Sequence, residues 1–108
     1  MPPFDLDKIQ DEIGAWNDKN FPDGTPDDVL IGATEELGEL AHAHLKGKQG
    51  IRGTTQQHYD AACDALGDIA IYLMAYCHKR GISFEGCIDA AWDQVKKRDW
   101  TKNKENGE

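Results

Sequence analysis

Carboxylate side chains recur in one fixed order at two places in this chain. The stretch from Glu35 to Leu40 reads EELGEL and the stretch from Asp64 to Ile69 reads DALGDI, so both follow the order acid, any residue, Leu, Gly, acid, aliphatic. On a helix, residues four apart lie about 40° apart around the axis, which puts the acids of each phrase on one face. Such a face can hold a divalent cation through oxygen ligands, or it can be an ordinary solvated surface.

Both acidic phrases carry costs that a solvated surface would not need. Like charges at i, i+4 destabilise a helix, and Gly38 and Gly67, each placed just before an acid, suggest close approach by another helix or by a ligand. The apolar run IAIYLMAY follows Asp68, and no Lys or Arg occurs between Arg52 and Lys79. A metal ion is therefore the simplest counter-charge, and oxygen ligands favour Mg²⁺ or Mn²⁺.

The elements that must position these acids are four predicted helices with short connections. No alternating strand pattern with hairpin turns is present, and short connections favour antiparallel neighbours. We therefore expect an all-α fold, a four-helix antiparallel bundle. From cap to stop, the expected helices run from Asp5 to before Phe21, from Pro26 to about Lys46 with Gly47 as the stop, from Thr54 or Thr55 to Gly81, and from Ser83 toward Trp100.

Length and composition predict one domain covering residues 1–108, with a polar and frayed tail at about 101–108. An apolar content of 39% gives only a modest core, so a homo-oligomer, a homodimer or homotetramer, is expected to complete the bundle. Trp92 and Trp100 are expected to pack. The formal charge of -8 repels a phosphate backbone and disfavours long nucleic acid as a partner.

The cysteines and the hydropathy predict a cytoplasmic protein. The three cysteines are odd in number and form no C-x-x-C pair, so we expect reduced thiols packed as small apolar residues. No apolar run approaches the roughly 20 residues of a membrane span, and the amino terminus lacks a signal core.

The acidic phrases resemble the motif of the MazG-like all-α nucleoside triphosphate pyrophosphohydrolases, EExxE followed by ExxD. The likeness covers most of the chain, through W-N-x-x-x-F at 16–21, EELGE at 35–39, DALGDIAIYL at 64–73 and VKKRDW at 95–100. The resemblance implies a helical bundle that dimerises, sometimes as a pair of dimers. It also implies Mg²⁺-dependent hydrolysis of a nucleoside triphosphate, deoxynucleosides included, to the monophosphate and pyrophosphate.

Carried over by position, the resemblance implies metal ligands at Glu36, Glu39 and Asp68. Glu35 matches the first glutamate of the motif and would be a further ligand or would orient the water, so these four are the expected catalytic residues. One position departs from the motif, because Ala65 stands where the family has its second-motif glutamate. Either Asp64, four residues before Asp68, substitutes on the same helical stripe, or a ligand has been lost.

Aromatic and basic residues are the candidates for holding the substrate. Trp16, Asn17 and Phe21 could stack on and hydrogen-bond the base, with Tyr72 one turn from Asp68, although Trp16 fits core packing equally well. Arg98 resembles the family's carboxy-terminal arginine and would hold the pyrophosphate. Four lysines are weaker candidates for that role, and those of the KKR run could equally be a charged helix end: Lys46, Lys48, Lys79 and Lys96.

Two other classes of protein remain as alternatives. The sequence Glu39-Leu-Ala-His42 is an E-x-x-H, as in di-iron carboxylate bundles, but Asp68-Ile-Ala-Ile71 does not supply the second one that such a site needs. A non-catalytic nucleotide- or metal-binding helical module of the same fold is the other alternative, and Ala65 is the feature that favours it.

Overall fold

The computed structural model describes residues 4–108, and among these it contains four α-helices and no strand. The helices are α1 (Leu6–Asn20), α2 (Pro26–Gln49), α3 (Thr55–Arg80) and α4 (Phe84–Val95). The prediction of an all-α fold is confirmed. None of the helices in this described range is both long and apolar enough to cross a bilayer.

Local capping chemistry places the helix starts where the sequence predicts them. The Asp5 carboxylate accepts a hydrogen bond from the Lys8 amide at 3.1 Å, and the Ser83 hydroxyl accepts one from the Gly86 amide at 3.0 Å. Thr54 accepts from the Gln57 amide, while the Gln57 side chain accepts from the Thr54 amide at 2.8 Å. These bonds satisfy amide groups that have no partner within the first turn of a helix.

Two helix ends differ from the prediction. The second helix passes through Gly47 and stops at Gly50, whose left-handed backbone (φ 68°) closes it. Gly47 instead lies beside the next helix, where a Cβ would meet the Cβ of His58 at 3.4 Å. The last helix ends at Val95, short of Trp100.

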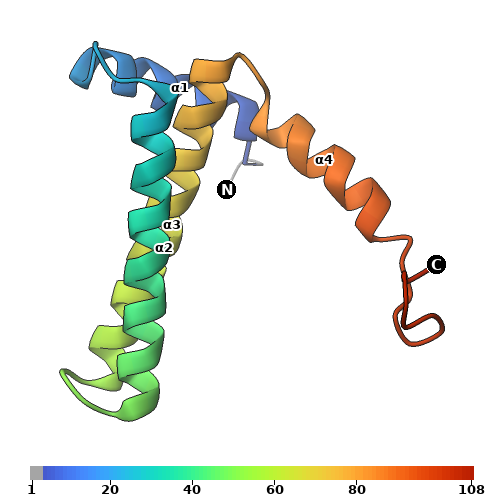
Figure 1. The fold of residues 1–108 in the computed structure, drawn as a ribbon. Helices are drawn as coiled ribbons and strands as arrows, with labels where there is room; N and C mark the ends of the chain where they lie inside the picture. Colours follow the sequence, from blue (N-terminus) through green and yellow to red (C-terminus); the bar gives the residue numbers. More distant parts are fainter. Residues whose placement is uncertain (1–3) are drawn as a thin grey trace.

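The centre of the molecule is an antiparallel hairpin made by α2 and α3, with α1 lying across its open end (Figure 1). Small residues are prominent in the core of these two helices, since the alanines at 33 and 43 on α2 and at 65 and 75 on α3 are all buried. Gly32 receives the ring of Tyr72, and Gly14 on α1 receives the ring of His78. Side chains at either glycine would clash with those rings, whereas a Cβ at Gly38 or Gly67 would meet nothing within 4 Å, so the glycines of the acidic phrases are not sites of close helix approach within residues 4–108.

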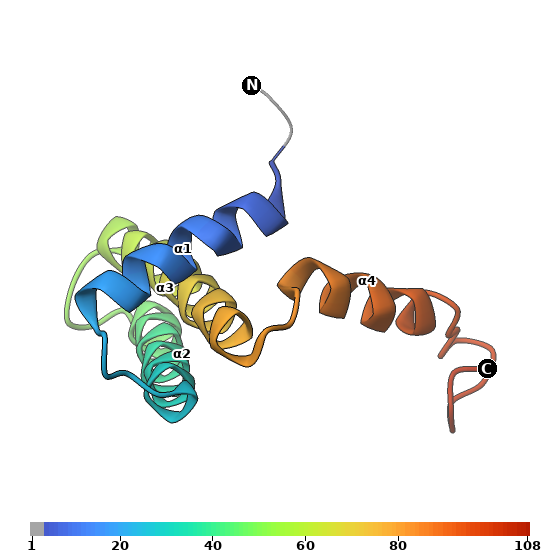
Figure 2. The same cartoon turned by 90° about the horizontal axis from the view of Figure 1, so that it is seen from above.

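The fourth helix leaves this body and does not close a bundle. Seen from above, α2 and α3 lie side by side while α4 extends away from them (Figure 2). It contacts α1 and α3 only, and none of its residues is buried. The radius of gyration is 17.2 Å, compared with about 13 Å expected for a compact domain of this length. One chain thus provides the four helices but not the closed four-helix packing.

Several side chains expected in the core are exposed in the single chain. Trp92 is 59% exposed and Trp100 is 51% exposed, so the prediction that both pack is wrong within one chain. Of the cysteines, only Cys77 is buried, whereas Cys63 and Cys87 are exposed, and all three are free.

Turns occupy the carboxy-terminal tail that was predicted to fray. The Asp99 amide donates to the carbonyl of Gly107, and Gly107, with a φ of 74°, is buried against Arg98 and Trp100.

Candidate active site

Four of the predicted acids gather where α2 and α3 face each other. We call Glu36, Glu39, Asp64 and Asp68 the carboxylate cluster. Partial burial, then the hydrogen bond and charge of Glu39, and then the charges of Asp68 and Asp64 raise the pKa of Glu36 above its ordinary value. The acids of α3 thus lie near enough for their charges to act on Glu36 of α2.

Glu36 is the member of the cluster with a buried oxygen atom that accepts no hydrogen bond from residues 4–108. Its Oε2 atom is buried and has no hydrogen-bond partner, although the residue as a whole is only half-buried. Asp68 is also half-buried, whereas Glu39 and Asp64 are exposed. Among the ion pairs of residues 4–108, none includes an acid of the cluster. A buried carboxylate oxygen beside three like charges calls for a cation.

The cluster is not a closed metal site. Within the described range, no group of three or more His, Cys, Asp or Glu side chains is close enough to hold a metal ion. The donor set nevertheless fits Mg²⁺ chemically, because it offers carboxylate oxygens, one of them buried and unpaired. Glu35 is exposed and is not among the charges that affect Glu36, so the structure does not join it to the cluster.

The residue that departs from the motif has a structural role here. Ala65 is only 2% exposed and is one of the buried alanines of the core. Asp64, next to it in sequence, contributes its charge at Glu36. Asp64 therefore contributes to the cluster, while its neighbour Ala65 is buried in the core.

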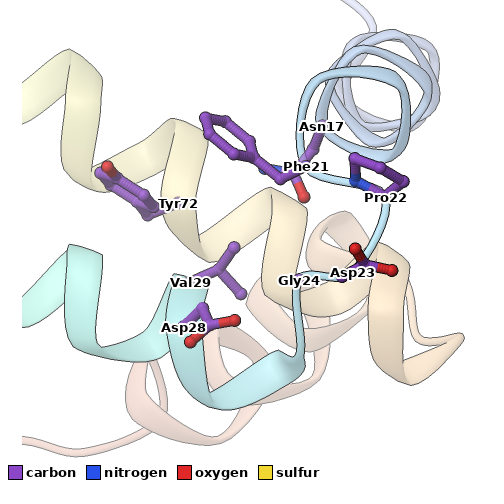
Figure 3. A pocket seen from close by; sticks show the side chains of 8 residues that line it. All are labelled: Asn17, Phe21, Pro22, Asp23, Gly24, Asp28, Val29 and Tyr72. Carbon is purple, nitrogen blue, oxygen red and sulfur yellow. The ribbon is translucent and has the colours of Figure 1, made fainter.

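A pocket of about 430 Å³ lies on the α1 side of the cluster. We call it the aromatic pocket (Figure 3); its lining residues are Asn17, Phe21, Pro22, Asp23, Gly24, Asp28, Val29 and Tyr72. Three of the four residues predicted to hold the base are thus brought together. The fourth, Trp16, lies outside the lining and packs edge-on against the Phe21 ring, with centroids 6.0 Å apart.

Asn17 gives this pocket an unusual polar group. The residue is 6% exposed, and its Oδ1 atom is buried without a hydrogen-bond partner. An unsatisfied buried amide oxygen costs about 1–3 kcal/mol. A cost of that size calls for a partner, which a ligand in the pocket could supply.

A second hollow, of about 520 Å³, lies on the other side of the cluster, toward the α2–α3 loop. We call it the loop-end hollow; its lining residues are Glu39, His42, Ala43, Arg52, Gln57, His58, Ala61 and Asp64. The sequence did not single out Arg52, His42 or His58 for this role. In an antiparallel hairpin, residues of the two helices lie near each other when they are a similar number of positions from the loop. The grouping of these residues could be predicted only if the end of α2 at Gly50 were known.

The basic residues proposed from sequence are not gathered at the cluster within one chain. Lys46 donates to the Gln49 side chain at 3.0 Å, and Lys79 donates to the Gly24 carbonyl at 3.0 Å. Lys48 lies on a different hollow of the hairpin, beside Tyr59. Arg98 and Lys96 follow α4, which makes no contact with α2.

Comparisons of the chain with protein-family models, with curated proteins and with solved structures found no match. The site must therefore be interpreted from its own residues.

Proposed function

We propose that this chain hydrolyses a nucleoside or deoxynucleoside triphosphate to the monophosphate and pyrophosphate with the help of Mg²⁺. The observation that carries the proposal is the unpaired Glu36 oxygen inside a cluster of four acids, beside a pocket whose wall holds an unpaired amide. The resemblance of EELGE and DALGD to the MazG-like motif supports the same assignment.

The order of the parts along the hairpin suits a nucleotide. Tyr72 of the aromatic pocket is one turn from Asp68, and Asp64 is one turn further, so the three positions span about 12 Å along α3. A base stacked on Phe21 or Tyr72 would place its phosphates over the carboxylate cluster. The buried amide of Asn17 would pair with a polar edge of the base, since amides match the donor and acceptor groups that bases present.

The chemistry divides between the ion and the side chains. Bound Mg²⁺ would supply charge neutralisation on the phosphate oxygens and polarise the reacting phosphorus. Glu36, Glu39 and Asp68 would hold it, with Asp64 in place of the family glutamate. Glu35, exposed and next to Glu36 in the sequence, would accept a proton from the attacking water. In that step the water oxygen bonds to the α-phosphorus, and the bond to the bridging oxygen breaks, so that pyrophosphate leaves with that oxygen.

The direct test is product analysis with the common NTPs and dNTPs in the presence of Mg²⁺. We expect equimolar monophosphate and pyrophosphate from the wild type, and at least a hundredfold slower turnover for Asp68→Asn and Glu39→Gln. Diphosphate and orthophosphate as products, or wild-type rates in both variants, would contradict the assignment.

A measurement without turnover tests the metal site separately. Mg²⁺ should raise the thermal midpoint of the wild type, because a ligand that binds only the folded state stabilises it by about 2.7 kcal/mol at a hundred times its Kd. The rise should be absent in Glu36→Gln and reduced in Asp64→Asn. A rise with Mg²⁺ and nucleotide but no product would favour the non-catalytic binding module, the alternative that Ala65 supports.

A further inference from the structure

The loop-end hollow is a cavity that the proposed function does not yet use. It shares Glu39 and Asp64 with the carboxylate cluster and otherwise runs toward the α2–α3 loop. The aromatic pocket lies on the opposite side of the cluster, toward α1. The groove therefore has three consecutive parts, in the order aromatic pocket, carboxylate cluster, loop-end hollow.

We propose that the loop-end hollow binds the two terminal phosphates of the substrate, and then the pyrophosphate product, with Arg52 as the main cationic contact. This inference rests on the proposed function for the direction in which the nucleotide lies. With the base in the aromatic pocket and the α-phosphate at the cluster, the remaining phosphates must extend toward the loop. Ala61 lies three residues from Asp64 toward the loop, about 4.5 Å further along α3, so the hollow continues past the cluster on that side.

Arg52 is the residue in this hollow that carries a permanent positive charge. The ion pairs of residues 4–108 do not include it, although Glu39 and Asp64 line the same hollow. A guanidinium group without a carboxylate partner has its full set of donors available, and its planar fork matches phosphate oxygens.

The loop holds the Arg52 backbone in a conformation that residues with a Cβ rarely adopt. Its φ is 60°, in the left-handed region, and it is the one residue other than glycine with a positive φ in the described part of the chain. Neighbouring bonds fix this geometry: the Ile51 amide donates to the Lys46 carbonyl at 3.3 Å, and His58 Nε2 donates to the Ile51 carbonyl at 2.9 Å. Fixed backbone of this kind is common at ligand sites, where it preorganises a side chain.

Histidine donors complete the hollow. His58 donates its Nε2–H to the carbonyl of Ile51, the residue before Arg52, so its role is to position Arg52. The ring of His42 also lines the hollow, and the side-chain hydrogen bonds of residues 4–108 do not include it. Its ring is free to donate to a phosphate oxygen. Because Glu39 and Asp64 would repel a bare polyanion, the ligand is pyrophosphate accompanied by Mg²⁺.

Binding of magnesium pyrophosphate to the whole protein, measured by calorimetry, tests the inference without turnover. The variant is Arg52→Asn, because asparagine tolerates a positive φ and keeps the loop folded. We expect its Kd for magnesium pyrophosphate to rise about tenfold, which corresponds to roughly 1.4 kcal/mol. Arg80→Asn is the matched control: Arg80 is exposed at the far end of α3, where it lies over the Tyr76 ring, and its variant should bind like the wild type.

The outcomes separate the two proposals. Wild-type affinity in Arg52→Asn, or no binding by the wild type at millimolar magnesium pyrophosphate, overturns the subsite while leaving the hydrolase assignment standing if NTPs are cleaved. Arg52-dependent binding without cleavage of any NTP supports the subsite and contradicts the hydrolase. In an active enzyme, Arg52→Asn should weaken product inhibition by pyrophosphate about tenfold and leave inhibition by the monophosphate unchanged.

Discussion

At the scale of single residues, Glu36 and Asn17 are the two side chains among residues 4–108 whose buried oxygens have no hydrogen-bond partner. Helical periodicity predicted that Glu36 shares a face with Glu39, because residues three apart lie about 60° apart around a helix whatever the tertiary structure. It could not predict that Glu36, and not Glu39, loses its exposure to water, since this depends on how deeply each side chain enters the α2–α3 contact. The role of Arg52 was equally hidden, because the backbone of a short loop determines it.

Glu36→Gln should stabilise the metal-free protein at neutral pH. Because the pKa of Glu36 is raised in the folded state, the folded protein holds that proton more tightly than the unfolded chain does. The free energy of unfolding therefore falls as the pH rises through the pKa of Glu36 in the folded state. Glutamine carries no charge at this position, so the variant does not lose this stability. Urea midpoints in EDTA should be higher for the variant than for the wild type at pH 7, and the two should converge near pH 4. A less stable variant at pH 7 would mean that Glu36 has a favourable partner in the fold.

The opposite pH dependence is expected at Asp18. His78 Nε2 donates to its carboxylate at 2.8 Å, and Lys79 Nζ lies 3.6 Å away. The hydrogen bond of His78, followed by the charges of His78 and Lys79, lowers the pKa of Asp18. This contribution is present above the unfolded pKa of about 3.9 and is lost as the pH falls through the folded pKa.

Asp18→Asn should accordingly lower the urea midpoint at pH 6 and have little effect at pH 2.5. Lys19→Gln serves as the control, because the neighbouring Lys19 takes part in none of the ion pairs among residues 4–108. A variant effect that did not change between these two pH values would show that the contact is not electrostatic.

At the scale of the helices, sequence signals located the starts better than the stops. A cap is a local contact between a side chain and the backbone amide three residues later, as at Asp5 and Ser83. The local sequence is therefore enough to predict it. Gly47 and Gly50 are both plausible stops from local sequence. The structure ends the helix at Gly50, whose left-handed backbone lets its amide donate to the Lys46 carbonyl.

Two glycines should respond in opposite ways to alanine. Gly14→Ala should destabilise the protein by about 1–2 kcal/mol, because the overpacking against His78 outweighs the better helix propensity of alanine. Nothing lies within 4 Å of a Cβ at Gly38, so Gly38→Ala should stabilise the single chain by up to about 1 kcal/mol. Chemical denaturation of both variants measures this.

The Gly38 variant also tests what lies against its helix face. If turnover or self-association falls while the free energy of unfolding rises, a ligand or a second chain approaches that glycine. Unchanged activity and association would leave Gly38 with no role in close approach.

At the scale of the whole molecule, α4 does not pack into a closed four-helix bundle within one chain. The modest apolar content of the sequence predicts that a second chain completes the bundle. Large apolar side chains remain exposed along the hairpin and α4, among them Leu37 at 57%, Leu66 at 55% and Trp92 at 59%. Charge is also divided: five of the twelve basic residues lie within residues 96–104, whereas the carboxylate cluster is on the hairpin. Both patterns favour α4 of one copy packing against the hairpin of another, which we propose as the homodimer or larger assembly.

Complementation between two inactive variants tests whether a partner supplies Arg98 to the site. Glu36→Gln lacks a metal ligand, and Arg98→Asn lacks the arginine beyond α4 that the resemblance assigns to pyrophosphate, a second contact in addition to Arg52. Co-expressed with different tags, they should form mixed dimers in which one site has Glu36 from one chain and Arg98 from the other. Random pairing makes half of the dimers mixed, so activity should recover to about a quarter of the wild-type value. Each variant alone should remain inactive. If Arg98 acted within its own chain, every site would lack one group and mixing would restore nothing, and a monomeric mass in light scattering would exclude the shared site altogether.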